Sequence, residues 1–271
     1  MSAWILLRGL IRETRHWGDF PARLGEALDG ARIVAIDLPG NGRLHAGQSP
    51  TRIEDMVAGA RRDLAARGIA PPYRLVALSL GGMVATAWAD RHPADIAGAV
   101  LINTSLRPFC PFYRRLRPGC YPRLLKLALL GGDEASWEEA IYDLTSARPA
   151  GKAGVLDDWI AWRRECTVTR ANALRQLVAA MRFRAPATAP ACPLLVLTSR
   201  GDALVDPRCS RLLAARWGTT FAEHPDAGHD LPLDDPAWVV ERIRAWRASA
   251  PPARLSRRDG GAPRSPRAPS P

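Results

Sequence analysis

Short apolar runs alternate with helical patterns in the first part of the chain and again near its C-terminal end. Apolar runs of about four to eight residues predict buried strands. They lie at residues 3–8, 31–37, 73–78, 96–102, 193–198 and 220–224. Helical patterns follow them at residues 17–28, 53–68, 80–91, 208–217 and 236–248. This alternation predicts an α/β fold, with a doubly wound, mostly parallel sheet of about six strands flanked by helices.

The alternation stops between residues 106 and 190. Several amphipathic helical segments follow one another there, at residues 124–130, 137–144, 155–166 and 171–183, without a strand pattern. We therefore expect a core formed by residues 1–105 and 191–250, with residues 106–190 inserted as a helical lid. Residues 251–271 are Pro, Arg, Ser, Gly and Ala with a single Asp and one large apolar residue, Leu255. Such a segment buries too little apolar surface to order itself, so we expect a disordered, basic, Pro-rich tail.

The length of 271 residues is enough to bury one large core. No stretch approaches the roughly 18 apolar residues that span a bilayer, so we expect no integral membrane association. The first apolar run lacks a basic leader and a small-residue cleavage site, which favours a strand over a signal peptide. The five cysteines are widely spaced and form no Cys-x-x-Cys motif. We expect free thiols in a reducing cytoplasm and no zinc site.

The formal charge of +11 raises the question of a nucleic-acid partner. Of the 38 basic residues only Lys126 and Lys152 are lysines, and the arginines are scattered through every segment. This distribution indicates a compositional bias and a solvated basic surface more than a designed binding face. We therefore expect no nucleic-acid partner, while the pattern leaves the oligomeric state undetermined.

Ser79 is the most informative residue of the chain. The apolar run at 73–78 ends at this serine, and a helical pattern begins immediately, at Leu80-Gly81-Gly82. A sharp turn from strand to helix holds a hydroxyl above the sheet, next to free N–H groups at the helix start. The same cluster of small residues also occurs at ordinary helix N-caps, and Ala77 stands where the usual Gly-x-Ser-x-Gly pattern has its first glycine.

A serine nucleophile needs a base, and the base needs an orienting carboxylate. Asp202 lies just beyond the strand at 193–198, and His229 lies between the last strand and the last helix. In a doubly wound sheet all three positions fall at the carboxyl edge, where ligands bind. Asp206 is an alternative acid in the same loop. Asp226 and Asp230 flank His229 so closely that turn or cap roles are expected for them.

On these motifs the chain resembles the α/β-hydrolase superfamily. The segment 77–82 looks like the nucleophile elbow, and Asp37-Leu38-Pro39-Gly40-Asn41-Gly42 is similar to the Asp-x-Pro-Gly-His-Gly turn of that family. Leu7-Arg8-Gly9-Leu10 looks like the family's oxyanion loop, and the inserted helices match its lid. The resemblance covers residues 1–250, and the order Ser79, Asp202, His229 is the order of the family.

The resemblance implies a role for each of these residues. Ser79 would be the nucleophile, His229 the general base and then acid, and Asp202 the orienting acid. The backbone N–H groups of Leu10 and Leu80 would form the oxyanion hole. No metal and no organic cofactor is implied. Within the charged segment 8–17, which we call the oxyanion loop, Arg8 replaces the usual His and would place a charge at the mouth of the site.

Arg8, Glu13 and His16 are candidate substrate-binding residues, and the alternative is an internal Arg–Glu ion pair that stiffens the oxyanion loop. The function that these residues favour is a serine hydrolase that cleaves a carboxylic ester of a small or medium acyl substrate through an acyl-enzyme. Thioester, lactone and carbon–carbon bond hydrolysis use the same triad, and a non-catalytic hydrolase-like binding protein is the alternative from another class. The substrate itself has no readable code in the sequence.

Overall fold

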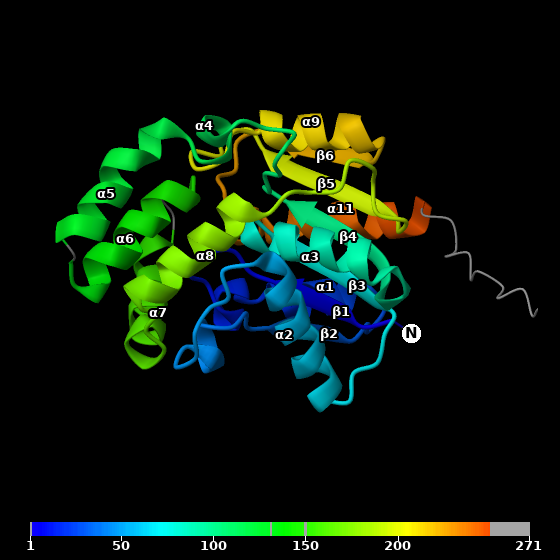
Figure 1. Ribbon diagram of the computed structural model, residues 1–271, viewed down its shortest axis with the longest axis horizontal. Coiled ribbons are helices and arrows are strands. Elements are labelled where there is room, and N and C mark those ends of the chain that lie inside the picture. Colours follow the sequence, from blue (N-terminus) through cyan, green and yellow to red (C-terminus); the bar gives the residue numbers. More distant parts are fainter. Residues whose placement is uncertain (1, 131, 149–150, 250–271) are drawn as a thin grey trace, which may run out of the picture.

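A six-stranded sheet forms the centre of the molecule (Figure 1). The computed structural model describes residues 2–130, 132–148 and 151–249, so the tail expected at 251–271 lies outside the described residues. The strands lie in the order β2-β1-β3-β4-β5-β6, and every neighbouring pair is parallel. They are β1 (Trp4–Leu7), β2 (Ile33–Ile36), β3 (Tyr73–Leu78), β4 (Ile96–Ile102), β5 (Leu194–Ser199) and β6 (Thr220–His224). The predicted fold class and all six strands are confirmed.

The two faces of the sheet bury alternate residues of the same strands. Leu75 and Ala77 of β3 lie in one hydrophobic cluster, and Val76 and Leu78 lie in the other. A parallel strand that is covered on both faces has no polar side, which is why these segments are continuous apolar runs in the sequence. The sheet is therefore fixed by burial on both sides.

Helices cover both faces. The first cluster takes in α2 (Ile53–Ala66), α3 (Leu80–Arg91) and α9 (Arg208–Trp217), and the second takes in α1 (Phe20–Ala27) and α11 (Pro236–Ser249). Short helical turns connect these elements: η1 (Thr14–Trp17), η2 (Gly42–Leu44), η3 (Pro93–Asp95) and α10 (Leu231–Asp234). The helix expected at 17–28 begins later, as α1 at Phe20, and Gly18 at a φ of 53° separates it from the preceding turn η1.

Residues between β4 and β5 form a helical insertion. It consists of α4 (Phe112–Arg115), η4 (Pro118–Cys120), α5 (Tyr121–Leu130), α6 (Glu134–Thr145), α7 (Lys152–Glu165) and α8 (Arg170–Arg182). Figure 1 shows α5, α6 and α7 gathered together on one side of the sheet. The described residues of this insertion contain no strand, as the sequence predicts.

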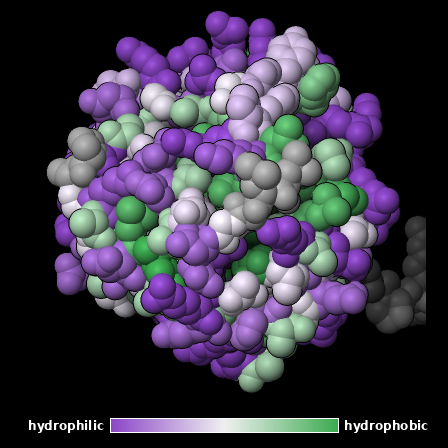
Figure 2. Space-filling model, turned by 90° about the vertical axis from the view of Figure 1, so that its left-hand side faces the viewer, coloured by the Kyte–Doolittle hydropathy of each residue, from purple (hydrophilic) through white to green (hydrophobic). Residues whose placement is uncertain are grey.

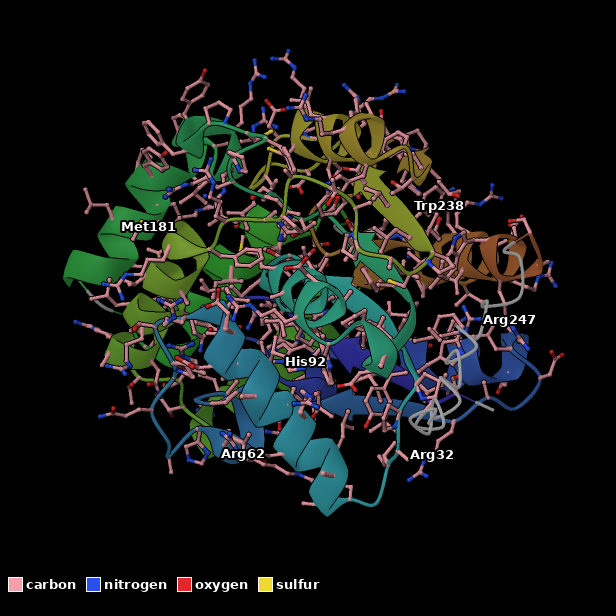
Figure 3. All side chains as sticks on the ribbon, turned by 45° about the vertical axis from the view of Figure 1, so that its right-hand side comes forward. Arg32, Arg62, His92, Met181, Trp238 and Arg247 are labelled. Atoms are coloured by element: carbon pink, nitrogen blue, oxygen red, sulfur yellow. The ribbon has the colours of Figure 1, made fainter. Side chains whose placement is uncertain are left out.

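The surface of the insertion is mixed in character. Several large apolar side chains remain exposed on it, among them Phe112 at 74% and Leu174 at 60% exposure, and Figure 2 shows apolar patches between hydrophilic residues on this side of the molecule. None of the helices in the described part of the chain is long and apolar enough to cross a membrane. Arginines project at separate places on the surface, as Arg62, Arg32 and Arg247 show in Figure 3.

Candidate active site

Ser79 lies in a strained turn between β3 and α3. Its φ of 56° and ψ of −113° are rare for a residue with a side chain and are typical of a nucleophile elbow. The turn requires glycine on its helix side. A Cβ on Gly82 would lie 2.6 Å from the hydroxyl oxygen of Thr104, and one on Gly81 would lie 2.8 Å from the carbonyl oxygen of Arg8. Ala77 is fully buried in the core, so the sheet accommodates its methyl group.

His229 and Asp202 form a buried pair. The Nδ1 atom of His229 lies 2.7 Å from Oδ2 of Asp202, and the two residues are 4% and 1% exposed. The other carboxylate oxygen of Asp202 accepts hydrogen bonds from the backbone N–H groups of Leu204 and Val205, each at 2.8 Å. These bonds fix the carboxylate, and a proton on Nδ1 leaves Nε2 of His229 as an acceptor for a serine proton.

Asp206, the alternative acid, lies elsewhere in the same loop. Its carboxylate accepts from the backbone N–H of Arg208 at the start of α9, at 2.9 Å. Its backbone N–H donates to the carbonyl of Arg114 at 2.9 Å. Of the two carboxylates proposed from the sequence, the structure brings Asp202 to His229.

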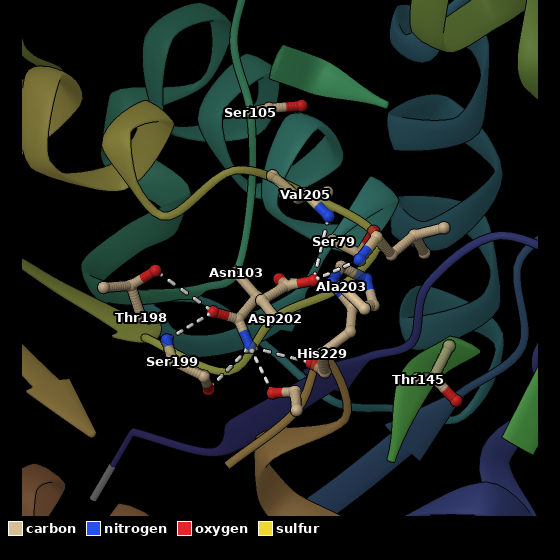
Figure 4. A network of polar contacts seen from close by, with 12 residues as sticks. Ser79, Asn103, Ser105, Thr145, Thr198, Ser199, Asp202, Ala203, Val205 and His229 are labelled. Carbon is tan, nitrogen blue, oxygen red and sulfur yellow. Dashed lines mark hydrogen bonds and ion pairs between the residues drawn. The ribbon is translucent and has the colours of Figure 1, made fainter. Parts of the chain in front are cut away.

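The segment at the end of β4 connects Ser79 to His229. The backbone N–H of Ser79 donates to the carbonyl of Ile102 at 2.9 Å, and the hydroxyl of Thr104 donates to the carbonyl of Ser79 at 2.8 Å. Between these two residues, the amide of Asn103 donates to the carbonyl of His229 at 2.8 Å (Figure 4). Ser79, Asp202 and His229 therefore share the carboxyl edge of the sheet.

The expected oxyanion donors lie close to Ser79 along the chain and across the turn. Leu80 is the first residue of α3, and neither its N–H nor that of Leu10 donates to an acceptor among the described residues. The oxyanion loop approaches Ser79 closely, since a Cβ on Gly9 would lie 3.2 Å from the Cβ of Ser79. Free N–H groups at a helix start carry partial positive charge, which suits a developing oxyanion.

Arg8 does not face solvent at the mouth of the site. It is 2% exposed, and its Nη1 and Nη2 atoms donate to the two carboxylate oxygens of Asp230 at 3.1 and 2.5 Å. The guanidinium also lies over the ring of Trp17, 4.9 Å from its centroid. The charge expected at the mouth is therefore neutralised inside the protein. Asp230 takes the N-cap position of α10, as expected of a turn or cap residue, and its carboxylate binds Arg8 rather than the helix start.

Glu13 and His16 also turn inward. Glu13 forms an ion pair with Arg15, which is the internal Arg–Glu pair expected as the alternative. His16 lies between the rings of Trp159 and Trp162, with centroid distances of 5.3 and 5.2 Å. Burial, and secondarily the charge of Arg12, lower the pKa of His16 well below its ordinary range. The cavity beside these residues holds about 10 Å³, room for one water molecule and not for an ester.

Two sets of residues around the site were not predicted. Asn103 binds both the segment of His229 and the end of β5. Its position directly after a strand is the sequence feature that could have indicated it. Glu138 of the insertion binds Arg12 of the oxyanion loop at 2.6 Å and Arg163 at 3.1 Å, and no local pattern indicates this contact. Among the described residues, no group of three or more His, Cys, Asp or Glu side chains is arranged to hold a metal ion.

Comparison with known proteins gives a consistent result. The model of the alpha/beta hydrolase family matches residues 5–242 of this chain. A protein of Klebsiella pneumoniae named "Putative carbamate hydrolase RutD" is 29% identical over 211 residues, which are 75% of this chain and 76% of that protein. The pimeloyl-[acyl-carrier protein] methyl ester esterase of Chromobacterium violaceum is 40% identical over 93 residues, 34% of each chain.

Another curated match is more limited. A stretch of 105 residues is 37% identical to the biotin biosynthesis bifunctional protein BioHC of Teredinibacter turnerae, and it spans only 17% of that protein. Among solved structures, the enol-lactonase of Burkholderia xenovorans LB400 superposes with a TM-score of 0.70 and 22% identity. The alignment covers 92% of this chain and 92% of the lactonase, so the two proteins share the fold.

Proposed function

The chain belongs to the alpha/beta hydrolase family, and we propose that it is a serine hydrolase that cleaves the carboxylic ester of a small or medium acyl substrate. The observation that carries the proposal is the buried contact of 2.7 Å between His229 and Asp202 at the sheet edge where Ser79 forms its strained turn. Those three side chains are the parts that acyl transfer to a serine requires.

In the first half of the proposed reaction, Oγ of Ser79 attacks the ester carbonyl while Nε2 of His229 takes the hydroxyl proton. The carbonyl oxygen becomes an oxyanion, which the N–H groups of Leu10 and Leu80 bind. Each such donor is worth about 2.7–4 kcal/mol in enzymes where one has been removed. When the tetrahedral intermediate collapses, His229 gives its proton to the departing alcohol and Ser79 carries the acyl group.

In the second half, His229 takes a proton from a water molecule, and the water oxygen attacks the acyl-enzyme. A second tetrahedral intermediate forms at the same donors and releases the carboxylic acid, while the proton returns to Ser79. Throughout, Asp202 holds the tautomer of His229 and stabilises the imidazolium that forms. Every proton therefore passes through His229, and no step requires a metal or an organic cofactor.

The contacts of the helical insertion fit the role of a lid over the proposed active site. Thr145 of this insertion accepts a hydrogen bond from the backbone N–H of Asp230, directly after His229, at 2.7 Å. Glu138, which lies in α6 as Thr145 does, binds Arg12 of the oxyanion loop at 2.6 Å. A lid that contacts both loops would exclude water from the acyl-enzyme and line the substrate pocket.

The relatives favour an ester bond first and a carbamate second. One is named as a methyl ester esterase, and another, with 75% of this chain covered, as a carbamate hydrolase. The same serine can attack a carbamate carbonyl, and the oxyanion that forms would bind the same N–H donors. Thioester, lactone and carbon–carbon bond hydrolysis use the same triad, so the substrate panel includes thioesters and lactones beside esters and carbamates.

The test is covalent labelling followed by a substrate panel. The wild-type protein should react with a fluorophosphonate probe, with the adduct on Ser79 by peptide mass spectrometry. It should also hydrolyse p-nitrophenyl esters of graded acyl length faster than acyl-CoA thioesters, lactones and aryl carbamates. Ser79→Ala should abolish both reactions, whereas Ser105→Ala, at a buried serine after the neighbouring strand, should retain both.

Two results would count against the proposal. A wild-type protein that is folded, fails to label and turns over no member of the panel would support the non-catalytic binding protein instead. Labelling at Ser79 with turnover of only the carbamate would keep the nucleophile and replace the substrate class.

A further inference from the structure

We propose that Asn103 is a positioning residue that holds the loop carrying His229 in register with Asp202 and Ser79. We define this loop as residues 225–230 and call it the base loop. The inference rests on the proposed function, because it assigns Asn103 to the same site. Asn103 itself acts through other residues and touches no reacting atom.

One side of the Asn103 amide binds the strand that leads to the acid. Its Oδ1 accepts hydrogen bonds from the backbone N–H of Ser199 at 2.9 Å and from the hydroxyl of Thr198 at 3.2 Å. Ser199 is the last residue of β5, three positions before Asp202. This side of the amide therefore fixes where the acid loop begins.

The other side of the amide binds the base loop. Its Nδ2 donates to the carbonyl oxygens of His229 at 2.8 Å and Gly228 at 3.2 Å, and it lies 3.0 Å from the hydroxyl of Ser199 (Figure 4). The two carbonyls flank the Cα atom of His229 on the chain. Because the ring of His229 is carried by that Cα atom, these bonds determine where the imidazole can lie.

The backbone around Asn103 connects this amide to the nucleophile. Ile102 and Thr104, its two neighbours, hydrogen-bond the backbone N–H and carbonyl of Ser79. Asn103 itself has a φ of 45°, in the left-handed region that asparagine tolerates better than most residues with a side chain. It is fully buried. Asn103 thus joins the segments of all three proposed triad residues, those of Asp202 and His229 through its side chain and that of Ser79 through its backbone neighbours.

An asparagine suits this place because it has donors and an acceptor on one short planar group. Loss of the amide would leave the carbonyls of Gly228 and His229 without this donor inside the protein, and buried unpaired carbonyls drive local rearrangement. The base loop would keep its other bonds, from Gly228 N–H to Asp234 at 2.6 Å and from Asp230 N–H to Thr145 at 2.7 Å. We therefore expect a displaced histidine in a protein that still folds.

The experiment compares three substitutions at this position. Asn103→Gly keeps the left-handed backbone and removes the amide, Asn103→Ala removes the amide and strains the backbone, and Asn103→Asp keeps the acceptor while losing both donors. The turnover number per active site, titrated with the fluorophosphonate, should fall about 100-fold in all three, as a misplacement of about 1 Å does. The KM for the best p-nitrophenyl ester should change less than about threefold.

Asn172→Ala is the matched control. Asn172 is also a buried asparagine, and its amide binds Ser49 N–H at 2.9 Å and the Gly47 carbonyl at 2.9 Å, away from the base loop. It should lose stability as the Asn103 variants do and keep its turnover number per titrated site. If Asn103→Gly keeps the wild-type turnover number, or loses activity only through its unfolded fraction, the positioning role is overturned.

Hydrogen–deuterium exchange separates this proposal from the proposed function. In Asn103→Gly, the amides of residues 227–230 should exchange faster than in wild type and in Asn172→Ala. This holds whether or not the protein hydrolyses an ester, so failure of the labelling test removes the proposed function and leaves the contact itself testable. Unchanged exchange in the base loop would show that Asn103 does not hold it.

Discussion

Arg8 and Asp230 form a buried, bidentate ion pair that joins the oxyanion loop to the base loop across 222 positions of sequence. Arg8 precedes Gly9, which lies against Ser79, and Asp230 follows His229. Because the pair connects the two loops directly, the spacing between the proposed oxyanion donors and His229 depends on it. Arg8 therefore holds two loops together inside the protein, although its place in the sequence made it a candidate for substrate contact.

Removal of one partner of this pair should strongly destabilise the protein. Arg8→Met leaves the carboxylate of Asp230 buried without its counter-charge, and breaking a buried pair in this way costs about 3–5 kcal/mol. The free energy of unfolding in urea measures the loss. In the control Arg23→Ala, which breaks the exposed pair between Arg23 and Asp19, the change should stay within about 1 kcal/mol. A similar small change in Arg8→Met would contradict the structural role given to the pair.

Replacement by asparagine should lower kcat strongly at Asp202 and only slightly at Asp206. Asp202→Asn removes the acceptor that fixes His229 at 2.7 Å, and the wrong tautomer of the base should lower kcat about 10⁴-fold, as in serine proteases. Asp206→Asn changes a side chain that accepts from Arg208 N–H, so kcat should stay within a few-fold. Steady-state kinetics on the best ester decides between them, and the reverse order would make Asp206 the acid.

The arrangement of the proposed triad could be predicted because local patterns located the strand ends. Parallel strands place their carboxyl ends at one edge, so Ser79 after β3, Asp202 after β5 and His229 after β6 had to lie near one another once the strands were known. Asp202 was preferred to Asp206 because it lies just beyond the strand and Asp206 lies deeper in the loop, and the contact with His229 favours the same choice. The insertion was predictable for a similar reason, since a helical period without strands is a local property of the sequence.

The supporting contacts could not be predicted, because they join distant segments with no shared pattern. Arg8 meets Asp230, and Arg12 meets Glu138, only after the sheet and the insertion have formed. Asn103 follows a strand as Ser79 does, and the rule that located the triad also applied to it. It was missed because an asparagine has no titratable or nucleophilic group to mark it.

Gly9→Ala should impair catalysis more than folding. The added Cβ would lie 3.2 Å from the Cβ of Ser79 and 3.8 Å from its hydroxyl oxygen, so the nucleophile or the oxyanion loop must shift. A shift of this kind should lower kcat about 10- to 100-fold, measured on the best ester. Gly154→Ala is the control, because a Cβ there meets nothing within 4 Å in helix α7. It should stabilise the protein by about 0.5–1 kcal/mol and keep kcat; equal kcat in both variants would contradict a close approach of Gly9.

Stability should fall as the pH drops below about 6.5, in part because of His16. Burial and the charge of Arg12 lower the pKa of His16 in the folded protein, so the unfolded chain binds a proton first as the pH falls. The neutral ring of His16 therefore makes its full contribution to the free energy of unfolding above the pKa of the unfolded chain. As the pH falls from there toward the pKa in the folded protein, this contribution decreases by up to about 1.36 kcal/mol per pH unit. Urea unfolding at pH 7.5 and 5.5 should show a smaller loss in His16→Gln than in wild type. His92→Gln, which keeps His16, should lose as much as wild type, and equal losses in all three proteins would exclude His16 as a source of the pH dependence.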